Sequence, residues 1–333
     1  MTHLAIIGAG SWGTALAIVA ARAQHDVSLW SRDPSVVNSI NNKRHNPRYL
    51  SFAKIPEQVT ATESLDESVR ETDLVFLATP SHAARQLLAA VKPYLRNSAT
   101  IVSVAKGIEI DSGKRISQVV NEVLGESFFE KFVCLSGPSF AKEVVESHPT
   151  AIVAASRTAE AAQMVQSELS SESLRIYTNS DVVGTELGGS VKNVMAIAAG
   201  MTKGLGYGSN SIAALITRGI AEMTRLAMSQ GGQLETLMGL AGLGDLVLTC
   251  TGTLSRNRFV GEELGKGRSL DEIVSSMNEV AEGIKTSRAV QRLAKESGIE
   301  MPITNEVAAV LYEGKTAREA VVNLMTRPLR SET

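Results

Sequence analysis

A glycine motif near the start of the chain restricts the possible folds more than any other feature of the sequence. Gly8, Gly10 and Gly13 form the pattern G-x-G-x-x-G between the apolar run Leu4 to Ile7 and the small-residue run Thr14 to Ala23. In a β-α-β unit, such glycines permit a tight turn, a close approach to a pyrophosphate and close packing of helix on strand. The motif therefore predicts dinucleotide binding at the N-terminus of the following helix.

The alternation of apolar runs with helical patterns through the first half of the chain indicates a parallel sheet covered by helices on both faces. The predicted strands are Leu4 to Ile7, Val27 to Trp30, Leu74 to Ala78, Ile101 to Ala105, Val133 to Ser136 and Ala151 to Ala155. After about Asn179 the strand pattern ends, and helices separated by glycine-rich turns follow. We expect a Rossmann-like doubly wound α/β domain over residues 1–180 and an all-helical substrate and catalytic domain over residues 181–333.

The composition excludes several classes of partner. The 33 basic and 35 acidic residues give a net charge of −2, which offers no electrostatic reason to bind nucleic acid or an acidic membrane surface. The uncharged run Leu4 to Ala21 is as long as a membrane span, but its glycines and the lack of a preceding basic region argue against stable membrane insertion. Cys134 and Cys250 are too few for a disulfide framework, and the five histidines are scattered. We therefore expect a cytoplasmic protein without a metal.

The residues that follow the second predicted strand bear on the choice of cofactor. NAD-specific folds usually place a carboxylate here to bind the ribose diol, whereas this chain has Ser31 and Arg32. Asp33 comes one position later and precedes Pro34, which favours a role as a helix N-cap. Arg32 is then expected to contact the 2′-phosphate of NADPH, and we predict that NADPH and/or NADH is the cofactor.

Two segments at predicted strand ends offer groups for a substrate. Lys106 and Gly107 follow the strand that ends at Ala105, and the segment Gly137 to Ala141 follows the strand that ends at Ser136. In an open α/β sheet, ligands bind beyond the carboxyl ends of the strands. A solvated surface lysine is the alternative interpretation of Lys106.

Lys192 lies on a predicted helix, Val182 to Met201, that is mostly apolar and rich in small residues. Its helical neighbours include Thr185, Gly188, Gly189, Ala196 and Ala199, so we expect space for a small ligand around the lysine. A partly buried lysine loses hydration and tends toward a lowered pKa, which suits a catalytic acid or base. A lysine that reaches solvent at a domain edge is the alternative.

A possible phosphate site follows later in the chain. Asp245 stands in a glycine-punctuated apolar run, where it is either a helix cap or turn residue or a partner for a lysine. Ser255 is predicted to cap a new helix, with Arg256 and Asn257 in its first turn. Backbone N–H groups, a hydroxyl, an amide and a guanidinium could together hold a phosphate dianion.

With these residues in view, the chain resembles the bacterial NAD(P)-dependent glycerol-3-phosphate dehydrogenase family along nearly its full length. The matching segments are Gly8 to Ala15, Ala105 to Gly107, Ser136 to Ala141, Glu186 to Asn193, Gly242 to Asp245, Ser255 to Asn257 and Val280 to Gly283. Each motif alone is weak, but their combination is highly specific.

The resemblance implies a role for each residue of the site. It implies that cofactor contacts are made by Ser11, Trp12, Arg32, Lys106, Ala141, Arg256, Val280 and Glu282. It makes Lys192 the catalytic acid or base and places the substrate among Lys106, Gly137, Ser139, Lys192, Asp245, Ser255, Arg256 and Asn257. The family also implies interconversion of dihydroxyacetone phosphate and glycerol 3-phosphate, supply of the phospholipid glycerol backbone, and a homodimer.

Two other functions are compatible with the same motifs. One is another two-domain dehydrogenase that acts on a hydroxy acid, which would need groups that recognise a carboxylate. The other is a cofactor-sensing protein without turnover, against which the presence of Lys192 argues.

Overall fold

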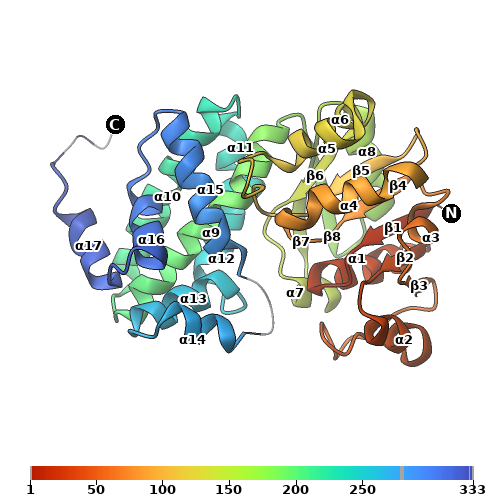
Figure 1. Cartoon of the computed structure of the whole chain (residues 1–333), viewed down its shortest axis with the longest axis horizontal. Coiled ribbons are helices and arrows are strands. Elements are labelled where there is room, and N and C mark those ends of the chain that lie inside the picture. The colour runs from red at the N-terminus through yellow and green to blue at the C-terminus, as the bar shows by residue number, and fades with distance from the viewer. Residues whose placement is uncertain (1, 278–280, 330, 332–333) are drawn as a thin grey trace. The chain divides into compact units, whose positions relative to one another are not determined.

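The computed structural model describes residues 2–277, 281–329 and 331, which form two compact units (Figure 1). The first unit contains Met1–Glu109 and Lys114–Glu186, and the second contains Ile110–Gly113 and Leu187–Thr333. The division after Glu186 falls inside a long helix, Val182–Gly204.

The first unit is built on a sheet of eight strands in the order β3-β2-β1-β4-β5-β6-β7-β8. The strands are β1 (His3–Ile7), β2 (Asp26–Trp30), β3 (Val59–Thr62), β4 (Leu74–Leu77), β5 (Thr100–Ser103), β6 (Val133–Ser136), β7 (Thr150–Ser156) and β8 (Leu174–Asn179). All six predicted strands are present. β6 and β7 pair antiparallel, whereas the other neighbours pair parallel, so the sheet is mostly parallel rather than entirely so.

The sequence analysis missed β3 and β8, and the reason lies in their burial. Both strands alternate buried and exposed side chains instead of forming a continuous apolar run, as is expected of strands near the edges of a sheet. The central strands β4, β5 and β6 are buried along their whole length, and Leu4 and Ile6 of the neighbouring β1 are 0% and 1% exposed.

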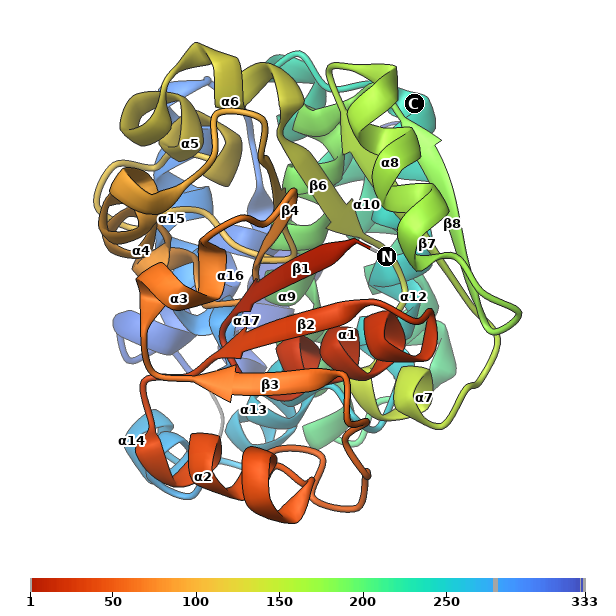
Figure 2. The same cartoon turned by 90° about the vertical axis from the view of Figure 1, so that its right-hand side faces the viewer.

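Helices cover both faces of this sheet. Figure 2 shows α1 (Ser11–Arg22) and α8 (Ala159–Leu169) on one side of the strands, and α4 (Ala84–Val91) and α5 (Ile116–Leu124) on the other. The remaining helical segments of the unit are α2 (Pro34–Lys43), α3 (Leu65–Val69), η1 (Ser81–Ala83), η2 (Lys92–Tyr94), α6 (Glu126–Lys131) and α7 (Ala141–Val145). The doubly wound layout predicted from the sequence is confirmed.

The described residues of the second unit form helices and connecting turns, without a strand, as the sequence predicts. They begin with α9 (Val182–Gly204), which is buried over most of its length. The others are α10 (Ser209–Ser229), α11 (Leu234–Met238), the π-helical turn η3 (Leu240–Gly244), α12 (Asp245–Thr251), α13 (Arg256–Gly265), α14 (Leu270–Ser275), α15 (Glu282–Glu296), α16 (Pro302–Tyr312) and α17 (Ala317–Met325). Among the described residues, no helix is both long and apolar enough to span a membrane.

Glycines allow α9 and α13 to cross with their backbones in contact. A Cβ atom on Gly200 would lie 2.0 Å from the carbonyl oxygen of Arg258, and one on Gly261 would lie 1.9 Å from that of Ile197. Such distances are far inside van der Waals contact, so any larger residue would push the helices apart. The crossing holds the beginning of α13 against the part of α9 that follows Lys192.

Candidate active site

The glycine motif lies between β1 and α1, and the geometry explains each glycine. Gly8 has a φ of +120°, and a Cβ there would lie 2.5 Å from the carbonyl oxygen of Ala78. A Cβ on Gly13 would lie 1.8 Å from the carbonyl oxygen of Gly8. Gly10 differs, because no described atom lies within 4 Å of its Cβ position and no side chain caps α1 there. The turn and packing roles are confirmed, and the space at the Cβ position of Gly10 fits a close approach of a pyrophosphate to the backbone.

Three further residues predicted to contact the cofactor lie near this helix end or at the start of α7. Ser11 and Trp12 form the first turn of α1, and Ala141 is the first residue of α7. Trp12 and Ala141 are both partly buried and pack against the core of the first unit. Part of the surface of each residue therefore stays exposed.

The corner after β2 contains the predicted helix cap. The Oδ1 atom of Asp33 accepts hydrogen bonds from the backbone N–H of Ser35 at 2.9 Å and from its hydroxyl at 2.7 Å. The hydroxyl bond holds the pKa of Asp33 below its usual range. Asp33 is therefore the N-cap of α2, as predicted. Arg32 is exposed, and within the described part of the chain its side chain makes no polar contact.

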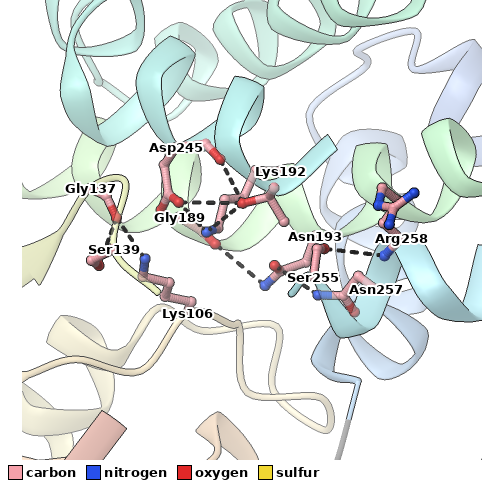
Figure 3. Close-up of polar contacts among 11 residues, drawn as sticks. Lys106, Gly137, Ser139, Gly189, Lys192, Asn193, Asp245, Ser255, Asn257 and Arg258 are labelled. Atoms are coloured by element: carbon pink, nitrogen blue, oxygen red, sulfur yellow. Dashed lines mark hydrogen bonds and ion pairs between the residues drawn. The ribbon is translucent and has the colours of Figure 1, made fainter. Parts of the chain in front are cut away.

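The first unit also brings together three of the predicted substrate residues. The ammonium group of Lys106 donates a hydrogen bond to the carbonyl oxygen of Gly137 at 2.9 Å, and the hydroxyl of Ser139 donates to the same oxygen at 3.0 Å (Figure 3). Gly137 has a φ of +135°, and a Cβ there would lie 2.9 Å from the Cα atom of Ile152. Residues that follow β5 and β6 thus meet at the carboxyl ends of these strands. Because Lys106 is hydrogen-bonded to this segment, it is not merely a solvated lysine.

The second unit contains a buried polar cluster around Lys192. The side chains of Lys192 and Asp245 are 6% and 1% exposed, and the ammonium group pairs directly with the carboxylate (Figure 3). The ammonium group also donates to the hydroxyl of Thr249 at 3.0 Å, and this hydroxyl donates to the backbone oxygen of Asp245 at 2.6 Å. Of the two interpretations of Asp245, the partner for a lysine is therefore the observed one.

Thr249 was not predicted as part of the site. It stands four residues after Asp245 on α12, and side chains with this spacing share one face of a helix. The spacing could have identified Thr249 only if the pairing of Asp245 with Lys192 had been known.

The expectation of an open face around Lys192 is wrong at Gly188. A Cβ atom on Gly188 would lie 2.5 Å from the carbonyl oxygen of Ala241, so the small residue accommodates the backbone of η3 and not a ligand. Cys250, beside the same cluster, is a buried free thiol, and burial raises its pKa to about 12. Among the described residues, no group of three or more His, Cys, Asp and Glu side chains could hold a metal ion.

The start of α13 has the predicted cap. The hydroxyl oxygen of Ser255 accepts a hydrogen bond from the backbone N–H of Arg258 at 3.2 Å, and Arg256 is exposed in the first turn. The sequence analysis missed Arg258, whose guanidinium donates to the carbonyl oxygen of Gly252 at 3.0 Å and pairs with Glu262 at 3.1 Å. Arg258 therefore holds the turn before α13 against the helix.

Asn257 makes contacts within the protein. Its amide donates to the Oδ1 atom of Asn193 at 3.0 Å (Figure 3). Its own oxygen accepts from the backbone N–H of Gly283 at 2.9 Å. These bonds connect α13 with α9 and with the start of α15, where Glu282 is the first residue. Val280, also predicted to contact the cofactor, lies outside the described residues.

Comparison with known proteins accounts for both units. The N-terminal and C-terminal domain profiles of NAD-dependent glycerol-3-phosphate dehydrogenase match residues 3–162 and 181–322. The chain is 50% identical over 334 residues to a protein of Koribacter versatilis named glycerol-3-phosphate dehydrogenase (NAD(P)+), covering 100% of this chain and 99% of the relative. A relative of the same name from Citrifermentans bemidjiense is 49% identical over 99% of this chain and 98% of its own. The crystal structure of glycerol-3-phosphate dehydrogenase from Coxiella burnetii superposes with a TM-score of 0.94 at 40% identity, covering 98% and 99% of the two chains.

Proposed function

Because this chain belongs to the NAD-dependent glycerol-3-phosphate dehydrogenase family, we propose that it reversibly converts dihydroxyacetone phosphate to sn-glycerol 3-phosphate with NAD(P)H. The observation that carries the proposal is the buried cluster of Lys192, Asp245 and Thr249. A charged lysine held in a dry environment is suited to stabilising negative charge that develops on a carbonyl oxygen.

We propose that the cofactor binds at the glycine motif, and the family resemblance implies the further contacts named below. The space at the Cβ position of Gly10 supports a pyrophosphate there, and the exposed guanidinium of Arg32 supports a contact with a 2′-phosphate. The other residues proposed to contact the cofactor are Gly8, Ser11, Trp12, Gly13, Lys106, Ala141, Arg256, Val280 and Glu282. When bound, NAD(P)H supplies the hydride.

The phosphate of the substrate is assigned to the start of α13. Backbone N–H groups at a helix N-terminus attract anions, and the exposed Arg256 adds a positive charge in the first turn. Ser255 and Asn257 flank Arg256 in the sequence, and the family resemblance implies that Gly137, Ser139 and Lys106 also contact the substrate. We propose that residues 1–180 form the cofactor domain and residues 181–333 the substrate domain.

Lys192 is proposed to act as the acid. Its ammonium group polarises the ketone and donates a proton to the oxygen that becomes the new hydroxyl, while the carbon of the ketone receives the hydride. In the reverse direction, the neutral amine accepts the proton of the hydroxyl. Asp245 and Thr249 hold the Nζ atom in one place, which fixes the direction from which the proton is delivered.

The proposed reaction also implies a metabolic role and a cellular compartment. Glycerol 3-phosphate provides the glycerol backbone for phospholipid synthesis. The two free, buried cysteines are compatible with a reducing cytoplasm. The family resemblance also implies a homodimer, which sedimentation of the purified protein would test.

The proposed reaction is tested by measuring the oxidation of NADPH with three related carbonyl compounds. Dihydroxyacetone phosphate should be reduced. Dihydroxyacetone and glyceraldehyde 3-phosphate should be poor substrates, because the first lacks the phosphate and the second has its carbonyl group at another carbon. Turnover of a hydroxy-acid substrate instead would support the alternative dehydrogenase class. Cofactor binding without any turnover would support a cofactor-sensing protein.

A further inference from the structure

The segment that follows α2 is anchored to the glycine motif by a buried asparagine. The side chain of Asn46 is 0% exposed, and its amide donates to the carbonyl oxygen of Ala9 and to the hydroxyl of Thr14, both at 2.9 Å. Its oxygen accepts hydrogen bonds from the backbone N–H groups of Arg48 and Tyr49, both at 3.1 Å. The backbone at Arg48 is therefore fixed relative to the turn that is proposed to bind the cofactor.

The guanidinium of Arg48 reaches the corner after β2. Its Nη2 atom lies 2.8 Å from the Oδ2 atom of Asp33, with the two side chains 62% and 23% exposed. The other oxygen of Asp33 is already occupied by the two hydrogen bonds from Ser35. Both oxygens of the carboxylate thus have partners, so Asp33 is not free to accept bonds from a ribose diol.

Because the ion pair of Arg48 and Asp33 is partly exposed to solvent, it stabilises the fold only slightly. Its position is more informative, because Asp33 directly follows Arg32 at the corner where Rossmann folds bind the ribose and its 2′-phosphate. An unpaired carboxylate at this corner would repel a phosphate dianion. Arg48 neutralises that charge and brings a second guanidinium to the residue that follows Arg32.

We propose that Arg48 is a second guanidinium of the 2′-phosphate subsite, and that its pairing with Asp33 determines discrimination between NADPH and NADH. The inference rests on the cofactor site proposed above and adds a residue to it. NADH has a hydroxyl in place of the 2′-phosphate, so Arg48 should contribute little to its binding.

The test is calorimetric titration of NADPH and NADH into the full-length protein and its Arg48→Ala variant. The dissociation constant for NADPH should rise about tenfold or more, and that for NADH should change less than about twofold. Arg48→Lys keeps the charge and should retain part of the NADPH affinity. Asp33→Asn added to Arg48→Ala should recover part of it as well, because asparagine still caps a helix but carries no charge.

Arg70→Ala is the matched control. Arg70 is 61% exposed and pairs with Asp66 on α3 at 3.2 Å, so its ion pair resembles that of Arg48 in exposure but lies elsewhere. It should leave both dissociation constants unchanged. Equal weakening of NADPH and NADH by Arg48→Ala, or no weakening, overturns the proposal. A parent protein that binds NADPH but does not reduce dihydroxyacetone phosphate would instead contradict the proposed function, and one that binds neither cofactor would contradict both.

Discussion

The ammonium group of Lys192 on α9 and the carboxylate of Asp245 on α12 form an ion pair in which the two side chains are 6% and 1% exposed. Neither charge would be stable alone at this depth, since removal of one partner from a buried pair typically destabilises a protein by about 3–5 kcal/mol. Each charge of the pair is therefore compensated by the other inside the protein. The proposed mechanism uses the ammonium form of Lys192 to polarise the ketone and to donate the proton.

Thr249 should position the acid, because its hydroxyl accepts a hydrogen bond from Lys192 at 3.0 Å and is itself bonded to the backbone of Asp245. Thr249→Val keeps the shape of the side chain and removes the hydroxyl. We expect kcat for dihydroxyacetone phosphate to fall about tenfold, with a smaller change in KM. Thr249→Ser should restore most of the rate. Equal rates for the valine and serine variants would show that the hydroxyl does not act on Lys192.

Arg256 should bind the phosphate of the substrate from the first turn of α13. Arg256→Ala is expected to raise KM for dihydroxyacetone phosphate about 10- to 100-fold and to lower kcat, because phosphate binding also orients the ketone. Arg268→Ala is the control, since Arg268 pairs with Glu263 near the other end of α13 and is 41% exposed. An unchanged KM in the Arg256 variant would place the phosphate elsewhere.

The predictable parts of the fold are those that depend on neighbouring residues in sequence. Gly8 and Gly13 identify the turn between β1 and α1, and Asp33 and Ser255 are caps that bond to N–H groups two or three residues later. Such signals are local, so the sequence alone contains them. The antiparallel direction of β7 is not such a local signal, because it depends on the path by which the chain returns from β6.

The unpredicted parts of the site depend on contacts between distant residues. Gly188 leaves room for the backbone of Ala241, and Thr249 meets Lys192 across 57 positions of the chain. The hydrogen bonds from Asn257 to Asn193 and from Gly283 to Asn257 likewise join three helices. No periodicity in one segment reveals which other segment will pack against it.

The crossing of α9 and α13 should not tolerate a methyl group at Gly261, where a Cβ would lie 1.9 Å from the carbonyl oxygen of Ile197. We expect Gly261→Ala to lower the free energy of unfolding by about 1–3 kcal/mol and to raise KM for the phosphorylated ketone. Gly208→Ala is the control, because no described atom lies within 4 Å of that Cβ position, so its cost should be limited to the preference for glycine as the N-cap of α10. Equal urea midpoints for the two variants would contradict the packing account.

Stability should also depend on the protonation of Glu222 on α10. Glu222 is 3% exposed, and its carboxyl group accepts a hydrogen bond at 2.7 Å from the backbone N–H of Ile303 in the first turn of α16. Burial raises the pKa of Glu222 to about 7, although its hydrogen bonds oppose the shift. Because the folded pKa lies above the unfolded value, the folded state binds the proton more tightly, and stability is lost as pH rises through about 5 to 7.

Urea unfolding at pH 5 and pH 8 checks this dependence. Each unit of pKa difference corresponds to about 1.4 kcal/mol, so the parent should lose at most about 3 kcal/mol from this group between the two pH values. Glu222→Gln should remove that loss. Glu272→Gln is the control, since the hydroxyl of Ser269 lowers the pKa of Glu272 and its titration falls below this range. Identical pH dependence in the parent and the Glu222 variant would contradict the assignment.

The most direct test of the account is the turnover of Lys192→Met, measured per folded molecule with NADPH and dihydroxyacetone phosphate. Since this change leaves Asp245 buried without its partner, the double variant Lys192→Met with Asp245→Asn should be measured beside it, and near-ultraviolet circular dichroism should establish that both are folded. We expect kcat to fall by at least about 10²- to 10⁴-fold in both variants while NADPH affinity barely changes. A folded Lys192→Met protein that reduces dihydroxyacetone phosphate at nearly the parent rate would contradict the assignment of Lys192 as the acid.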